Sequence, residues 1–223
     1  MAANRLYDQL KDACPTEWEE YTRHNFVRGI ADGSLQLEAF RFYLVQDFLF
    51  LKHFARAYAL AVYKSEHLDD MRAALASTTA ILGETGVHLK YCAEWGLDES
   101  DIVATPEAHE TTAYTRFVLE RGMSGDLLDL HVALSPCAVG YAEIGRLIVD
   151  ELEPKTDGNP YQDWIDVYSG EEFCAGADAQ VAMLDRQMTL RGGPGRFEGL
   201  AETFRIATRL ERDFWQMGLN AAA

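Results

Sequence analysis

Cys137 lies in the stretch SPCAVGYAEIG (residues 135–145), directly after a proline and four residues before Tyr141. Residues four apart share one face of an α-helix, so a helix here would place the thiol and the phenol side by side. A thiol is a good nucleophile once a neighbouring group assists the loss of its proton. Pro136 either begins a helix or kinks one, and both arrangements leave backbone groups free near the thiol. The pair is therefore a candidate for covalent chemistry.

Two carboxylates, Asp47 and Glu211, occur where apolar side chains are expected. Each interrupts a series of apolar residues that recur every three or four positions, over 40–58 and over 197–218. Burying a carboxylate is costly unless it is paired or used. In a structural interpretation the acids pair with arginines or cap backbone groups, while the thiol and the phenol fill space. In a functional one, a thiol, two acids and several phenols form a pocket that holds a flat polar molecule, attacks it and moves protons.

Metal and phosphate sites have less support. Glu84 and His88 stand four residues apart, whereas di-iron helical bundles use two Glu-x-x-His pairs, which the sequence does not supply. His24 could in principle ligate a haem iron, but a lone histidine near an aromatic residue is more often a packed or capping side chain. The glycine-bearing segments 31–35 and 191–195 match neither a Walker nor a dinucleotide motif. We therefore expect no metal and no cofactor.

The composition and the net charge limit the classes of protein to which this chain can belong. The chain has 223 residues, 48% of them hydrophobic and 25% charged, and a net charge of −16. This size fits one globular domain over 1–223, and the acidic balance argues against nucleic-acid and membrane partners. The N-terminus has no apolar run of signal-peptide length, and no segment approaches the ~18 uncharged apolar residues of a membrane span. We expect a cytoplasmic protein whose four cysteines, which lack zinc-site spacing, are free thiols.

The elements that must position these side chains are helices. Between short clusters of glycine and proline, apolar residues recur every three or four positions rather than alternating. The pattern predicts an all-α fold. The predicted helices run over 4–23, 36–64, 67–95, 107–122, 125–152, 159–168, 171–190 and 196–218.

Five blocks of the sequence, in order and spread over nearly the whole chain, resemble the TenA family, the thiaminase II enzymes. They are HNFVRGIADGSLQLEAFRFYLVQDFLFLKHFARA (24–57), TTAYTRFVL (111–119), SPCAVGYAEIG (135–145), NPYQDWIDVYSGEEF (159–173) and RLERDFW (209–215). The resemblance implies a single-domain haem-oxygenase-like multi-helix bundle, in agreement with the all-α pattern. It also implies a homotetramer without a metal.

The resemblance implies a hydrolase of thiamin-derived aminopyrimidines that acts in thiamin salvage. Its favoured reaction converts 4-amino-5-aminomethyl-2-methylpyrimidine and water into hydroxymethylpyrimidine and ammonia, with thiamin cleavage as a secondary activity. By position, the nucleophile falls on Cys137, the catalytic acid/base on Glu211 and the residue that binds the pyrimidine amino group on Asp47. The pocket tyrosines fall on Tyr114, Tyr141 and Tyr168.

One position departs from the family pattern. Many members have a tyrosine three residues after the aspartate, where this chain has Phe50. A phenylalanine can stack on a pyrimidine but offers no hydroxyl, so the preferred substrate stays open.

Two other functions remain possible from the sequence alone. A non-catalytic pyrimidine- or thiamin-binding protein would keep Asp47 and the aromatic residues but would not need Cys137 and Glu211. A cofactor-dependent oxidase or haem protein on the same bundle would need a bound metal or haem, which an absorption spectrum would reveal.

Overall fold

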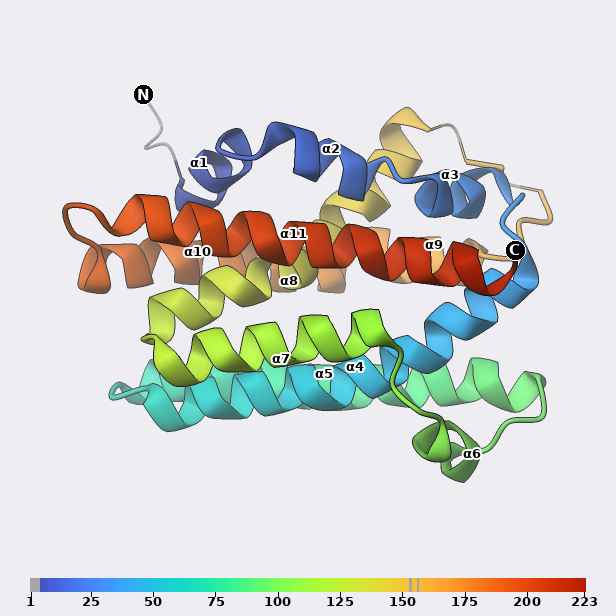
Figure 1. Ribbon diagram of the computed structural model, residues 1–223, viewed down its shortest axis with the longest axis horizontal. Coiled ribbons are helices and arrows are strands. Elements are labelled where there is room, and N and C mark those ends of the chain that lie inside the picture. The colour runs from blue at the N-terminus through green and yellow to red at the C-terminus, as the bar shows by residue number, and fades with distance from the viewer. Residues whose placement is uncertain (1–4, 153, 156) are drawn as a thin grey trace.

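The structure is a computed structural model that describes residues 5–152, 154–155 and 157–223. These residues form α-helices without a β-strand among them, which confirms the all-α prediction. The helices are α1 Leu6–Asp12, α2 Pro15–Thr22, α3 Asn25–Asp32, α4 Leu37–Lys64, α5 Leu68–Glu94, α6 Glu99–Ala104, α7 His109–Ser124, α8 Leu127–Glu151, α9 Gln162–Ser169, α10 Glu171–Arg191 and α11 Arg196–Ala221 (Figure 1).

The predicted helix over 4–23 is wrong as a single element. Residue 4 lies outside the described residues, and the remainder divides into α1 and α2. Pro15, the first residue of α2, has no backbone N–H to donate to a preceding turn. Proline also disfavours helical geometry in the residue before it, and Cys14 has φ −143° and ψ 55°. The chain therefore turns at Ala13 and Cys14.

The predicted helices omit α3 and α6, which are short. His24 precedes α3, and its Nδ1 atom accepts a hydrogen bond from the backbone N–H of Phe26 at 3.2 Å, which makes His24 a capping residue. Gly33 follows α3 with a φ of 75°, a left-handed conformation that glycine adopts without strain. Asp98 and Asp101 form a reciprocal capping box at the start of α6. In such short helices the caps are a clearer signal than apolar periodicity.

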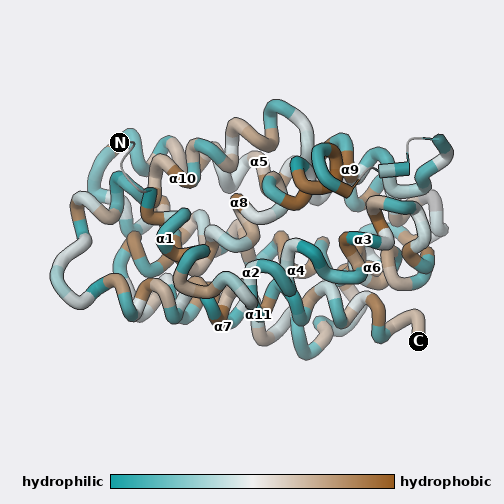
Figure 2. Tube along the Cα trace, turned by 90° about the horizontal axis from the view of Figure 1, so that it is seen from above, coloured by the Kyte–Doolittle hydropathy of each residue, from teal (hydrophilic) through white to brown (hydrophobic). Residues whose placement is uncertain are grey.

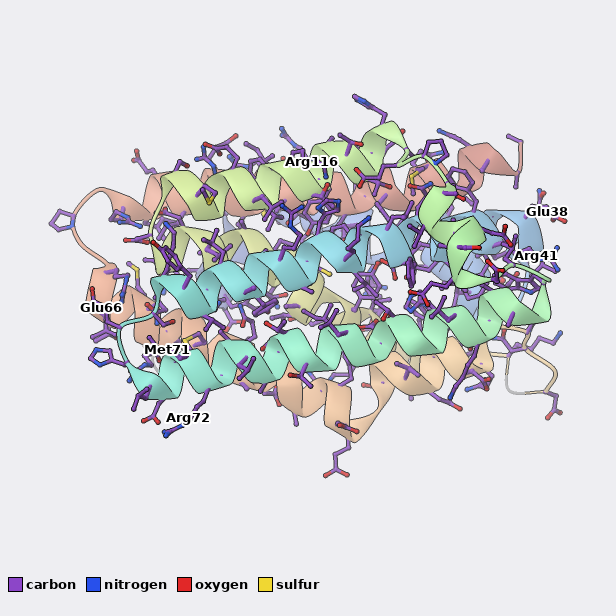
Figure 3. The ribbon with its side chains drawn as sticks, turned by 90° about the horizontal axis from the view of Figure 1, so that it is seen from below. Glu38, Arg41, Glu66, Met71, Arg72 and Arg116 are labelled. Atoms are coloured by element: carbon purple, nitrogen blue, oxygen red, sulfur yellow. The ribbon has the colours of Figure 1, made fainter. Side chains whose placement is uncertain are left out.

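α4 runs through the middle of the fold. α5 lies along one side of it and α7 along another (Figure 3). α8 packs against α7, α9, α10 and α11, and the N-terminal helices α1–α3 lie over α11 (Figure 1). Figure 2 shows hydrophobic and hydrophilic positions mixed along most helices, as expected when each helix buries one face. The long helices α4, α8 and α11 thereby share one interior.

That interior is rich in aromatic side chains, with Trp215 at its centre. The Trp215 ring stacks on Phe26 with 4.9 Å between the ring centroids. The rings of Tyr43 and Tyr141 lie 5.2 Å and 5.3 Å from it. These contacts fix α3, α4, α8 and α11 relative to one another, and the polar residues of interest lie beside them.

α8 is long and apolar enough to cross a membrane by length and composition alone. However, 67% of its most apolar stretch is buried inside the fold. It begins at a capping box, in which Asp126 accepts from the backbone N–H groups of Leu128 and Asp129 at 2.9 and 3.2 Å. Its apolarity is therefore that of a helix surrounded by other helices in a core.

Gly145 allows α8 and α9 to approach closely. A Cβ atom at this position would lie 2.5 Å from the backbone carbonyl oxygen of Tyr168. Gly145→Ala must therefore push the two helices apart, and we expect a loss of about 1–3 kcal/mol in the free energy of unfolding, measured by urea denaturation. The control is Gly83→Ala on α5, where nothing lies within 4 Å and alanine should add up to about 1 kcal/mol. Equal stability of the two variants would contradict the close approach.

Candidate active site

A cavity of about 810 Å³ lies between the helices, lined by residues of α4, α5, α8, α9 and α10. Among other residues, its wall includes the carboxyl groups of Asp47 and Glu84, the thiol of Cys137, and the phenols of Tyr141 and Tyr168. This volume is in the range of pockets that hold small organic ligands. The structure thus brings Asp47, Cys137, Tyr141 and Tyr168, four of the residues singled out in the sequence, to one cavity.

The other three sequence candidates lie next to this wall but are not among the residues that line the cavity. Tyr114 and Glu211 are 1% and 2% exposed, and the Tyr114 hydroxyl donates to Glu211 Oε1 at 2.9 Å. The Phe50 ring packs on Tyr114 with 5.0 Å between centroids and on Phe214 at 5.7 Å. Phe50 therefore supports Tyr114 in this structure.

Cys137 and Glu211 are neighbours, and each affects the pKa of the other. Burial raises the pKa of Glu211 to about 8; the hydrogen bond from Tyr114 opposes this rise, and the charge of Asp47 adds to it. Burial also raises the pKa of Cys137 well above its usual value, and the neighbouring carboxylates raise it further. At neutral pH the pair therefore consists of a protonated carboxyl group and a thiol, rather than a free thiolate.

Pro136 neither starts α8 nor ends it, because the helix continues through it. Its missing N–H leaves the carbonyl oxygen of Val132 without the usual helical donor. The hydroxyl of Ser135 donates to that oxygen at 2.9 Å, and Tyr21 OH donates to the carbonyl oxygen of Pro136 at 3.3 Å. Cys137 is thus in the interior of a helix, and of the two predicted arrangements the one in which Pro136 begins a helix is wrong.

Asp47 is held by a histidine from α5. His88 Nε2 lies 2.8 Å from Asp47 Oδ2, and its Nδ1 lies 3.0 Å from the carbonyl oxygen of Glu84. Both ring nitrogens thus face hydrogen-bond acceptors, an arrangement that suits a protonated imidazole. Burial lowers the pKa of His88, but the hydrogen bond and charge of Asp47 outweigh it and raise the pKa to about 9. Asp47, which also accepts from Tyr43 OH at 3.4 Å, is therefore paired with a cation.

Glu84 is another acidic residue of the cavity wall. It accepts a hydrogen bond from Tyr168 OH at 2.6 Å, which ties α5 to α9. Burial raises the pKa of Glu84, with the charge of His88 opposing the rise. The spacing of Glu84 and His88 was visible in the sequence, but their partners were not, because those partners come from α4 and α9. Tyr43, another partner of Asp47, was part of an apolar series and gave no separate signal.

The chemistry of the site follows from these contacts. Within the described part of the chain, no group of three or more His, Cys, Asp or Glu side chains could hold a metal ion. One end of the cavity instead offers a thiol beside a protonated carboxyl group, and the side chain of Asp47, whose oxygens can accept hydrogen bonds. Such groups can bind a flat polar ring, add sulfur to it and transfer protons.

Known proteins resemble this chain over nearly its full length. Residues 12–221 match the sequence profile of the TENA/THI-4/PQQC family. An uncharacterized protein of Haemophilus influenzae is 39% identical over 97% of this chain and 100% of its own length. The aminopyrimidine aminohydrolase of Halalkalibacterium halodurans is 35% identical over 91% of this chain and 90% of its own. A crystal structure described as a TenA family transcription regulator, from Silicibacter sp. TM1040, has a TM-score of 0.91 and 42% identity over 96% of both chains. These matches cover the blocks that suggested the TenA resemblance, and the chain belongs to the TENA/THI-4/PQQC family.

Proposed function

We propose that this protein is a cysteine-dependent hydrolase of thiamin-derived aminopyrimidines. Its reaction would convert 4-amino-5-aminomethyl-2-methylpyrimidine and water into hydroxymethylpyrimidine and ammonia, with thiamin cleavage as a secondary activity. The observation that carries the proposal is the Cys137–Glu211 pair beside the cavity that Asp47 lines. The similarity to an aminopyrimidine aminohydrolase supports it.

The first step uses Glu211 as both acid and base. Its carboxyl group carries a proton at neutral pH, since its pKa is about 8. One oxygen would give that proton to N1 of the pyrimidine, while the other takes the proton of the Cys137 thiol. The sulfur then adds to carbon 6, next to N1. The net change is addition of S–H across the N1–C6 bond, and Glu211 is protonated before and after it.

The second step breaks the bond to the leaving group. In the adduct, electrons from the 4-amino group form a double bond from carbon 5 to the exocyclic carbon. The bond to the leaving group breaks, and ammonia leaves from the protonated aminomethyl group, or the neutral thiazole leaves from the thiazolium of thiamin. The carboxylate of Asp47 would accept a hydrogen bond from the amino group and stabilise the positive charge that develops there. Water then adds to the exocyclic carbon, the thiol leaves carbon 6 with its proton restored, and the pyrimidine alcohol is released.

In this reaction His88 is a positioning residue, because it acts through Asp47. His88→Leu removes the cation that pairs with Asp47 and orients it, and charge-assisted hydrogen bonds of this kind contribute about 1.5–3 kcal/mol. We expect KM for the aminopyrimidine to rise by about tenfold or more, with a smaller change in kcat. His88→Gln, whose amide still donates, should recover part of the loss. Steady-state kinetics measure both values, and an unchanged KM in both variants would show that His88 does not orient the substrate-binding carboxylate.

From the family resemblance we propose that the protein is a homotetramer and that it acts in thiamin salvage in the cytoplasm. A subunit contact is supported by Leu68, Leu75 and Leu82, which are 65%, 57% and 56% exposed on α5. They are seven residues apart and therefore lie along one side of the helix. An exposed row of leucines of this kind suits burial against another subunit.

The experiment that tests the proposed function is product analysis with purified protein. The protein is incubated separately with 4-amino-5-aminomethyl-2-methylpyrimidine and with thiamin, and the pyrimidine products are identified by chromatography. We expect hydroxymethylpyrimidine from both compounds, faster from the first. Binding of both compounds without product from either would contradict a hydrolase and favour a binding protein.

A further inference from the structure

The cavity continues well past Cys137. Along α4 its lining runs from Asp47 through Leu51 and Phe54 to Tyr58, and along α8 it runs from Tyr141 through Cys137 to His131. Cys137 and His131 are six residues apart, which corresponds to about 9 Å along a helix. A pyrimidine ring bound at Asp47 and Cys137 would leave this second part of the cavity open to whatever is attached to its exocyclic carbon.

The end of this second part is polar. Tyr58 OH donates to Gln180 Oε1 at 3.4 Å, and Gln180 Nε2 lies 3.1 Å from His131 Nδ1. Because the amide nitrogen of Gln180 can only donate, Nδ1 of His131 accepts. Burial lowers the pKa of His131 to about 4, so its ring is neutral and carries its proton on Nε2. We name Tyr58, Gln180 and His131 the distal triad.

The Nε2–H group of His131 has no hydrogen-bond partner among the residues that the structure describes. His131 is only 4% exposed, and it lines the cavity. The Nε2 atom is not among the fully buried polar atoms that lack a partner, so it is open to the cavity, where a ligand oxygen can accept from it. The distal triad is therefore arranged so that one N–H group faces the open space.

The charges around this end favour a neutral ligand. None of the residues found to line the cavity, within the described part of the chain, is a lysine or an arginine. The nearby Arg186 is already paired with Asp70, with 2.9 Å between Arg186 Nε and Asp70 Oδ1. The charged residues that act on His131 are Asp70 and Arg191, and their charges are opposite in sign. Among the described lining residues, a phosphate would therefore meet no lysine or arginine to balance its charge.

From these contacts we infer that the distal triad binds the far end of the leaving group, with His131 Nε2–H donating to a neutral hydroxyl or carbonyl oxygen. The inference rests on the proposed function, since it assumes that the pyrimidine occupies the Asp47–Cys137 end. It assigns a substrate class, namely aminopyrimidines in which the exocyclic carbon carries a long leaving group whose far end is uncharged. Thiamin, with its hydroxyethyl arm, belongs to this class, and its phosphate esters do not.

The test compares kcat/KM for three compounds in the wild-type protein: thiamin, a thiamin analogue with ethyl in place of hydroxyethyl, and thiamin monophosphate. One hydrogen bond is worth about 0.5–1.5 kcal/mol. We therefore expect thiamin to be preferred over the ethyl analogue by about 3- to 10-fold, and over the monophosphate by about tenfold or more. Equal values for thiamin and the ethyl analogue would overturn the inference without any variant.

A variant then assigns the preference to the triad. His131→Leu should abolish the difference between thiamin and the ethyl analogue while leaving hydrolysis of the aminomethylpyrimidine within about twofold, because that substrate has no group long enough to reach His131. The control is His53→Leu, which removes a buried histidine of α4 that pairs with Glu107 at 2.7 Å outside the cavity lining. It should keep the thiamin preference. A preference that survives in His131→Leu would overturn the assignment.

Failure of the proposed function gives a different result. If the wild-type protein hydrolyses none of the compounds, including the aminomethylpyrimidine, the hydrolase proposal is wrong. The dissociation constants of thiamin and of its ethyl analogue, measured by calorimetry, then test the distal triad alone. A ratio near one would overturn the inference, and about threefold or more in favour of thiamin would support it.

Discussion

Cys137→Ser should lower the turnover of aminopyrimidine by at least about a thousandfold, as expected when the nucleophile of a covalent mechanism is removed. A serine hydroxyl is a much poorer nucleophile than a thiol toward carbon 6 of the ring, and Glu211 cannot assist the loss of its proton equally well. The dissociation constant should stay within about threefold, because Asp47 keeps its contacts with His88 and Tyr43.

The measurement pairs ammonia release with calorimetric binding of the same compound. Cys174→Ser is the control, since Cys174 is a half-buried free thiol that does not line the cavity. It should leave both values unchanged. Turnover of Cys137→Ser near the wild-type rate would eliminate the covalent mechanism, and loss of binding together with turnover would show that the variant had damaged the pocket instead.

Glu211→Gln should reduce kcat/KM by about 100- to 10,000-fold, the range typical of a lost general acid or base. The amide oxygen of glutamine can still accept from Tyr114 OH, so the surroundings are preserved. The amide cannot give a proton to the pyrimidine nitrogen or take one from Cys137.

The pH dependence distinguishes this role from a structural one. The pKa of Glu211 is raised to about 8, and the proposed reaction needs its protonated form. The wild-type kcat/KM should therefore be steady below pH 8 and fall as the pH rises through that value. In Glu211→Gln the first decline should move to about pH 9, where His88 loses its proton. A decline that stays at pH 8 in the variant would assign that ionisation to another group.

Apolar periodicity predicted which polar side chains are buried, because a polar residue that interrupts a series of apolar residues on one helix face must point into the core. Asp47 and Glu211 interrupt such series, and both are buried, 4% and 2% exposed. Cys137 and Tyr141 lie four apart on α8, and both line the cavity. Their catalytic and binding roles remain proposals.

The contacts between side chains of different helices could not be predicted from the sequence. His88 and Glu84 lie in a helix with mixed polar and apolar surroundings, so nothing marked them as partners of Asp47 and Tyr168. The distal triad joins residues from α4, α8 and α10. Side chains far apart in the chain meet only through the packing of the bundle, which periodicity does not specify.

Local backbone chemistry explains the remaining differences between the predicted helices and the observed ones. Pro15 divides the first predicted helix, whereas Pro136 leaves α8 continuous. The contrast has a physical cause. Around Pro136 the surrounding helices bury α8 on several sides, and Ser135 and Tyr21 donate to carbonyl oxygens near the proline. Before Pro15 the backbone of Cys14 leaves helical geometry, with φ −143° and ψ 55°, and a new helix begins at the proline.

The measurement that tests the central claim most directly is hydrolysis of 4-amino-5-aminomethyl-2-methylpyrimidine in water enriched in oxygen-18. Ammonia and the pyrimidine product are quantified together, and the molecular mass of the product is measured by mass spectrometry. The account predicts ammonia and hydroxymethylpyrimidine in equal amounts, with one heavy oxygen in the alcohol. Tight binding of the pyrimidine without release of ammonia would contradict it.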